Sequence, residues 1–174
     1  MYNHHASCII DISAMELNLN LLIKEAIDLE TNIAQLYLLF HRLFPEDEKL
    51  WWELSLEEQN HASLLKTALQ FNDSNVDVPE TLLPVGAEEL KKTSLRIVEF
   101  YKSVESNADR TRAFQFAYII ENSAGELHYD LFMKGPADTT MSALFKKLNG
   151  DDINHADRIR SYMIKHKIPM AEEN

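Results

Sequence analysis

The 174-residue chain has a single cysteine, Cys8, and only four glycines and five prolines. One cysteine excludes an internal disulfide framework and any zinc or rubredoxin-type iron site built from four cysteines of this chain. The sequence also lacks the run of about eighteen apolar residues that a membrane helix needs, and its first residues lack the basic and apolar regions of a secretory leader. These absences predict a soluble, cytoplasmic protein without a membrane span.

Positive charge is scarce as well. The chain has 17 lysines and arginines against 28 aspartates and glutamates, which gives a formal net charge of −11. Without a basic block, no binding to nucleic acid or to an anionic membrane is expected. A chain with 45% hydrophobic and 26% charged residues is long enough to bury one core and too short for two full domains. We therefore predict one domain over residues 1–174.

The few prolines and glycines separate long stretches in which apolar residues recur with the helical period, so the chain is predicted to be all-α. Short turns at Pro45 and at Gly135–Pro136 predict two antiparallel helix hairpins. Ser13 with Glu16 forms a capping box that predicts the start of the first helix. The helices are expected at about 14–43, from Pro45 to about 71, at 109–133 and at 139–167, with an extra helix at about 87–105 after a loop at 72–79. Residues outside about 14–166, His4 and His5 included, are expected to form short flexible tails.

Two segments of the chain repeat one motif. Residues 54–65 align without a gap with residues 148–159, and each segment contains an acid three residues before a histidine. About one such spacing is expected by chance in this composition, so the spacing alone is weak evidence. In both segments, however, the acid and the histidine interrupt the apolar stripe of the helix. The resulting pairs are Glu58 with His61 and Asp152 with His155, whereas the preceding acids, Glu57 and Asp151, are predicted to lie on the solvated surface.

The other two main helices each place one acid in the middle of an apolar face, at Glu30 and at Glu121. Burying these two acids with Glu58 and Asp152 would cost several kcal/mol per ionised group without cations. Two divalent ions would supply the missing positive charge. Carboxylate and imidazole ligands without sulfur suit iron or manganese. The predicted ligands of the two metals are Glu30, Glu58, His61, Glu121, Asp152 and His155.

These residues resemble the ligand pattern of the ferritin-like di-iron carboxylate family, most nearly its rubrerythrin-like branch. The resemblance implies an antiparallel four-helix bundle with a long crossover that carries the extra helix, and it covers roughly residues 14–166. It also implies two iron ions, or iron and manganese, that react with dioxygen or peroxide, an external electron donor, and a homodimer. The implied ligand roles are terminal carboxylates at Glu30 and Glu121, bridging carboxylates at Glu58 and Asp152, and terminal nitrogen ligands at His61 and His155.

The chain departs from the rubrerythrin-like pattern in three respects. Asp152 stands where the family has a longer glutamate, so its carboxylate reaches less far. Tyr118 and Ala124 flank Glu121 at the distances where rubrerythrins place an additional glutamate. No cysteine-rich rubredoxin module follows Ile168, so electrons have to come from a separate donor.

Each of these residues also has an ordinary structural interpretation. A single helix-face acid more often pairs with a base or reaches solvent, and a single histidine is more often a packed core residue. Tyr37, Tyr118 and Tyr129 fit hydrogen bonding or radical relay near a metal site, although aromatic residues on buried helix faces usually serve packing, and His128 fits a hydrogen bond near the site. Three functions remain open: a di-iron oxidoreductase, an iron-handling ferroxidase, and a helical interaction module whose metal site is structural or lost.

Overall fold

The computed structural model describes residues 4–70, 83–132 and 140–171, with side chains for 17–70, 86–123, 143–144 and 146–171. All of its regular elements are helical, and no strand occurs in the described ranges. The all-α prediction is therefore confirmed. The elements are α1 (His4–Leu43), the short 3₁₀ helix η1 (Pro45–Asp47), α2 (Glu48–Gln70), α3 (Leu83–Ser106), α4 (Arg110–Phe132) and α5 (Thr140–Lys165).

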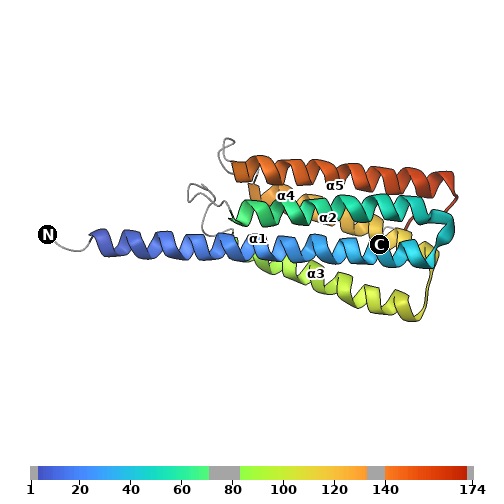
Figure 1. The fold of residues 1–174 in the computed structure, drawn as a ribbon, viewed down its shortest axis with the longest axis horizontal. Coiled ribbons are helices and arrows are strands. Elements are labelled where there is room, and N and C mark those ends of the chain that lie inside the picture. Colours follow the sequence, from blue (N-terminus) through green and yellow to red (C-terminus); the bar gives the residue numbers. More distant parts are fainter. Residues whose placement is uncertain (1–3, 71–82, 133–139, 172–174) are drawn as a thin grey trace.

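The five α-helices lie side by side in an elongated body, and the N-terminal part of α1 extends beyond the other helices (Figure 1). α1 packs against both α2 and α3, while α4 packs against α5. Contacts of α2 with α5 and of α3 with α4 join these parts. None of the helices over the described residues has the length and unbroken apolar character needed to cross a membrane.

The turn between α1 and α2 follows from Pro45. A proline disfavours the helical conformation at the residue before it, and Phe44 has φ −123° and ψ 78°. Pro45 itself has no amide N–H, so it is well tolerated in the first turn of the next helix. Glu46 and Asp47 follow in that turn, where negative charge is favourable. The predicted break at Pro45 is therefore confirmed.

The ends of the last two helices are also fixed locally. Asp109 precedes α4, and its Oδ1 accepts a hydrogen bond of 3.0 Å from the Arg112 amide. At the end of α5, Lys167 adopts a left-handed φ of 55°, and the Ile168 amide donates to the Met163 carbonyl at 2.9 Å. This closing pattern satisfies carbonyls that the helix itself leaves without a partner.

The predicted start of the first helix was wrong. α1 begins at His4, so Ser13 lies inside the helix, and His4 and His5 belong to the helix instead of to a flexible tail. The capping-box spacing was misleading because no proline or glycine precedes Pro45, and nothing in the sequence stops the helix from extending toward the N-terminus. The predicted loop at 72–79 and the turn at Gly135–Pro136 lie outside the described residues.

An aromatic cluster fills the core between the helices. Tyr37 and Phe40 of α1, Trp51 of α2 and Phe114 of α4 are all fully buried. The Trp51 ring lies 5.0 Å from Phe40 and 4.5 Å from Phe114, measured between ring centroids. Large buried rings of this kind supply much of the apolar area that stabilises a core.

A buried carboxylate ties three elements together at one end of the body. Asp47, 1% exposed, accepts two hydrogen bonds from the Arg110 guanidinium, at 2.6 and 2.7 Å. The Tyr162 hydroxyl donates a third, at 2.9 Å. Arg110 begins α4 and Tyr162 lies near the end of α5, so this polar cluster joins the α1/α2 hairpin to both later helices.

Removing Arg110 should destabilise the protein because the Asp47 charge would stay buried with one partner fewer. For Arg110→Met we expect the free energy of unfolding to fall by about 2–3 kcal/mol, somewhat less than for a fully buried pair because Arg110 is partly exposed. Urea denaturation followed by circular dichroism measures this change. Lys49→Met, which removes only the exposed pair with Glu53 at 3.8 Å, is the control and should leave the unfolding curve unchanged.

Candidate metal centre

The structure brings the six predicted ligands together in the core. Glu30 lies on α1, Glu121 on α4, and the two acid–histidine pairs on α2 and α5. All six side chains belong to residues that are 3% exposed or less. We refer to these six residues as the candidate metal centre: Glu30, Glu58, His61, Glu121, Asp152 and His155.

Five of the six residues form two overlapping groups with the spacing of metal ligands. Glu30, Glu58 and His61 make one group, and Glu58, Asp152 and His155 make the other. Within each group, the ligand atoms lie within 4.8 Å of one another. Glu58 belongs to both groups, whereas the shorter Asp152 belongs only to the second.

Each imidazole presents its Nδ1 atom to carboxylates of the centre. Nδ1 of His61 lies 3.1 Å from Glu58 and 3.7 Å from Glu30. Nδ1 of His155 lies 2.7 Å from the other oxygen of Glu58 and 3.5 Å from Glu121. The two rings stack with their centroids 5.5 Å apart and their planes 15° apart. Glu58 therefore contacts both imidazoles, one through each of its oxygens.

Glu121 joins the centre through both of its oxygens. Its Oε2 is the oxygen near His155, and its Oε1 accepts a hydrogen bond from the buried Tyr37 hydroxyl. Burial and the nearby carboxylates of Glu121 and Glu58 raise the pKa of Tyr37 well above its ordinary value, so the hydroxyl stays protonated as a donor. Tyr37 is thus a hydrogen-bond donor to the centre, one of the roles that the sequence left open for it.

The outward Nε2 atoms contact acids that sequence reasoning assigned to the surface. Nε2 of His155 lies 2.6 Å from Glu57, and Nε2 of His61 lies 3.3 Å from Asp151. The side chains of these acids are 39% and 38% exposed, so they do reach solvent, but their carboxylates also orient the two imidazoles. The predicted surface position is thus consistent with their exposure, but their contacts with the imidazoles were not predicted, because position on a single helix does not reveal a partner on another helix.

The pairing crosses between the two repeats. Glu57 of the first repeat contacts the histidine of the second, and Asp151 of the second contacts the histidine of the first. Each of the two acids also forms an ion pair with a basic side chain. Glu57 pairs with Arg158 at 2.5 Å, and Asp151 pairs with Lys147 at 2.5 Å. An acidic doublet before each histidine was visible in the sequence and was the one available signal for this arrangement. Carboxylates that hold the outer nitrogen of a metal-binding histidine fix its orientation and tautomer.

The two histidines carry protons when no metal is bound. Burial lowers the pKa of His61, but contacts with Glu30 and Glu58 outweigh burial and raise it to about 11. For His155, burial is likewise outweighed by Glu121 and Glu58, and the pKa rises to about 11. Burial also raises the pKa of Glu121, against the opposing effect of His155. Protonated imidazoles therefore replace metal cations as the positive charge at this buried site.

The atoms of the centre fit a divalent cation. Glu58 Oε1 and His155 Nδ1 are buried and form an ion pair at 2.7 Å, but this contact does not have the geometry of a hydrogen bond. Buried polar atoms without well-formed hydrogen bonds are uncommon in native cores. Oxygen and imidazole nitrogen donors converging on a common point are the donor set of many transition-metal sites.

The remaining residues considered from sequence are less informative. Tyr118 is half-buried one turn before Glu121, and its carbonyl accepts a hydrogen bond from Asn122. The side chains of His128 and Tyr129 lie outside the described part of the chain.

Neutralising the outer acids should weaken metal binding without removing a ligand. We expect Glu57→Gln and Asp151→Asn each to lower the affinity for one metal ion by about 10–100-fold, because an imidazole loses its orienting carboxylate. Isothermal titration with Mn²⁺ or Fe²⁺ measures the change. Glu53→Gln lies one turn away from Glu57 on the same helix and contacts no imidazole, so wild-type affinity is expected there. Equal affinities in all three variants would contradict the orienting role.

The raised pKa values of His61 and His155 make metal-free stability depend on pH. Because their folded pKa of about 11 exceeds the ordinary 6.5, the stabilisation is complete below pH 6.5 and is lost as pH rises toward 11. The melting temperature of metal-free protein should therefore fall over this range. Metal binding has to displace the protons, so its apparent affinity should rise over the same range. His155→Gln should flatten the metal-free profile, whereas the control His41→Gln, at a half-buried histidine that contacts none of the six residues, should reproduce the wild-type slope.

Comparison with known proteins finds no match for this chain among protein-family models, curated proteins or solved structures. The resemblance to the ferritin-like family therefore stays a prediction from the residues themselves, and a functional conclusion has to rest on the geometry of the candidate metal centre.

Proposed function

We propose that this chain is a di-iron carboxylate protein of the ferritin-like type, in which the candidate metal centre holds two iron ions, or iron and manganese. Its proposed activity is the reduction of peroxide or dioxygen with electrons from an external donor. The observation that carries the proposal is the burial of four carboxylates and two imidazoles, from four helices, at one place in the core.

A ferritin-like four-helix bundle is part of the same proposal. Two features support it. The helices that carry the six residues are α1, α2, α4 and α5, which form two hairpins in the chain order. α3 lies on the long connection between α2 and α4 and packs against α1 (Figure 1). In the proposed bundle, α3 is the helix of the crossover and contributes no ligand.

The charges of the centre favour two divalent ions over one. Four buried carboxylates balance four positive charges, and the protons on His61 and His155 would leave as the ions bind. Iron and manganese accept this mixture of oxygen and imidazole ligands. Bound iron would supply one-electron redox chemistry that protein side chains do not provide by themselves.

The distances within the centre suggest which residues would bind each ion. Glu30, Glu58 and His61 would hold one ion, and Glu58, Asp152 and His155 the other, with Glu58 shared. Glu121 would complete the second position. The Tyr37 hydroxyl holds Glu121 in place and is the one described hydroxyl group that donates a hydrogen bond to the centre. The surrounding apolar core keeps bulk water away from these groups.

Iron handling is the second candidate function. A net charge of −11 attracts cations to the protein, which would favour delivery of Fe²⁺ to the centre. In that case Fe²⁺ is the substrate, and its oxidation by dioxygen is the reaction. The two functions differ in whether the oxidised iron stays bound and is reduced again.

The proposal predicts the metal content of the protein and its dependence on the shared ligand. Protein from iron-replete cells should contain about two iron ions per chain. Glu58→Gln should lose both ions because it removes the carboxylate common to both groups, whereas Asp152→Asn should lose one. Glu53→Gln is the matched surface control. Metal analysis by plasma mass spectrometry measures these contents.

Peroxide consumption over many turnovers with a reductant present would favour the oxidoreductase, and a single round of Fe²⁺ oxidation followed by iron release would favour iron handling. Wild-type protein that retains no iron, manganese or other transition metal would contradict both and leave a helical interaction module.

A further inference from the structure

The outer face of α5 carries an exposed stripe that the described part of the chain leaves uncovered. Ile153 is 55% exposed and Ile164 is 62% exposed. Asp157 and Arg160 lie between them in the sequence, and both are exposed. The four residues follow one another at intervals of four, three and four, which places them on one side of the helix. We call Ile153, Asp157, Arg160 and Ile164 the α5 stripe.

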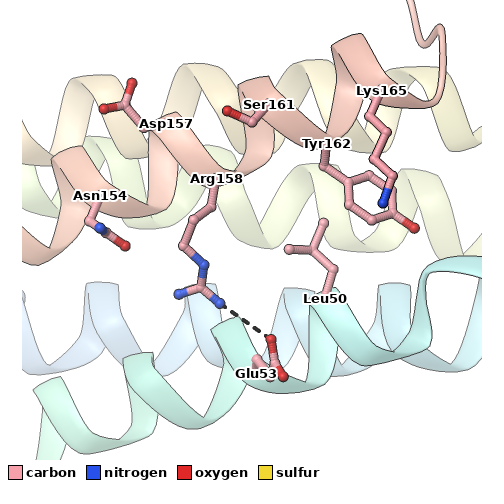
Figure 2. Close-up of a pocket in the computed structure, with 8 residues that line it drawn as sticks. All are labelled: Leu50, Glu53, Asn154, Asp157, Arg158, Ser161, Tyr162 and Lys165. Carbon is pink, nitrogen blue, oxygen red and sulfur yellow. Dashed lines mark ion pairs between the residues drawn. The ribbon is translucent and has the colours of Figure 1, made fainter.

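The α5 stripe lies on the opposite side of the helix from the candidate metal centre. Asp152 and His155 are the buried residues that α5 contributes to the centre. Figure 2 shows that Arg158 points from α5 toward α2, where it pairs with Glu53 at 3.6 Å. In the same view, Asp157 extends from α5 away from α2. The stripe therefore belongs to the outer surface of the helix.

The two charged residues of the stripe are not neutralised by the described residues. The side chains of Asp157 and Arg160 form no ion pair or hydrogen bond within the described ranges. In contrast, Arg158, which lies between them in the sequence, pairs with Glu57 at 2.5 Å. The stripe thus presents one acid and one base, both available to a partner, between two exposed isoleucines.

The order of residues along the stripe makes it complementary to itself. When a second copy of α5 lies antiparallel to the first, Asp157 can face the partner's Arg160, and Arg160 then faces the partner's Asp157. In the same register, Ile153 faces the partner's Ile164, and Ile164 faces the partner's Ile153. Each layer of such a helix pair combines either two apolar side chains or two opposite charges.

We propose that the α5 stripe binds a second copy of this chain, with the two α5 helices antiparallel. Pairing removes the apolar surface of the isoleucines from water. The charges fix the direction, because a parallel pair would place Asp157 against the partner's Asp157 and Arg160 against the partner's Arg160. The resemblance noted in the sequence implied a homodimer but indicated no surface for it, and the α5 stripe supplies both the surface and the direction.

The charges favour a second copy over an unrelated occupant of the stripe. The stripe contains one acid and one base, so it does not select a strongly acidic or a strongly basic partner. An anionic membrane is disfavoured by the net charge of −11. A second copy brings the matching charges at the matching spacing, and the two-fold symmetry of a dimer forms each contact twice.

The length of the stripe indicates the strength of the dimer. From Ile153 to Ile164 the helix is about 17 Å long, at about 1.5 Å per residue. A single helix pair of this length is smaller than the interfaces of most permanent complexes. We therefore expect a dimer that dissociates on dilution, with a dissociation constant in the micromolar range.

Sedimentation velocity over a wide range of protein concentrations tests the pairing. Wild-type protein should change from monomer to dimer as its concentration rises. Ile164→Glu should raise the dissociation constant by about tenfold or more, because symmetry places the new charge in two apolar layers. Leu95→Glu is the matched control, since Leu95 is 55% exposed on α3 and the same charge is added outside the stripe. This control should associate like wild type.

Charge reversal tests the antiparallel register. Asp157→Arg alone and Arg160→Asp alone should each weaken the dimer by about tenfold, because each creates two layers of like charge. The double variant Asp157→Arg/Arg160→Asp exchanges the charges and should associate like wild type. An equimolar mixture of the two single variants should also recover association, as a heterodimer, because every charged layer then combines opposite charges. Recovery in the mixture requires that both partners are copies of this chain.

Three results would overturn the inference. Wild-type protein that stays monomeric at every concentration would show that no second copy binds the stripe. A dimer that Ile164→Glu weakens no more than Leu95→Glu would have its interface elsewhere. A double charge variant as weak as the single variants would exclude the antiparallel register. The substituted side chains are exposed, so circular dichroism of the dilute proteins should show wild-type helix content and melting.

The inference does not rest on the proposed function, and metal analysis of the same samples separates the two. Ile164→Glu should retain the metal content of wild type, because the stripe contributes no ligand to the centre. A metal-free protein that still forms the predicted dimer would contradict only the metal centre. An iron-loaded protein that stays monomeric would contradict only the pairing of α5.

Discussion

The structure depends on one electrostatic constraint, which is the burial of four carboxylates in the core. Glu30, Glu58, Glu121 and Asp152 are each 2% exposed or less, and such a concentration of negative charge requires positive charge beside it. His61 and His155 supply it as imidazolium groups in the metal-free protein, and bound cations would supply it otherwise. Four helices have to stay in register for these six residues to meet, so the centre and the packing of the helices are mutually dependent.

The two copies of the repeated motif stabilise this charge together, because an acid of each copy contacts the histidine of the other copy. In each copy the second acid of the doublet faces the centre, and the first acid reaches across to the histidine of the other copy. Each imidazole is thereby held at Nδ1 by the centre and at Nε2 by the opposite helix. Arg158 and Lys147 anchor the outer acids. Away from the centre, the buried Asp47 with Arg110 joins the same helices at one end of the body.

The sequence predicted most of this arrangement because helical periodicity is a local property. Pro45 located the break between the first two main helices, and the apolar stripes identified which acids and histidines face inward. The start of α1 was missed because a capping pattern at Ser13 competes with a chain that contains no helix breaker before Pro45. The contacts of Glu57 and Asp151 with the imidazoles were missed because those imidazoles lie on another helix.

The amino-acid sequence by itself therefore determined the helical class, the helix boundaries near prolines and the inward phase of the six site residues. These properties follow from interactions within a few residues along the chain. Only the tertiary structure decided that Glu58 is shared between the two groups and that the outer acids cross to the opposite histidines. It alone also aligned Tyr37, Trp51, Phe114 and Tyr162 into one row. Contacts of this kind join residues far apart in the chain, and their geometry is set by how the helices pack, which no local pattern encodes.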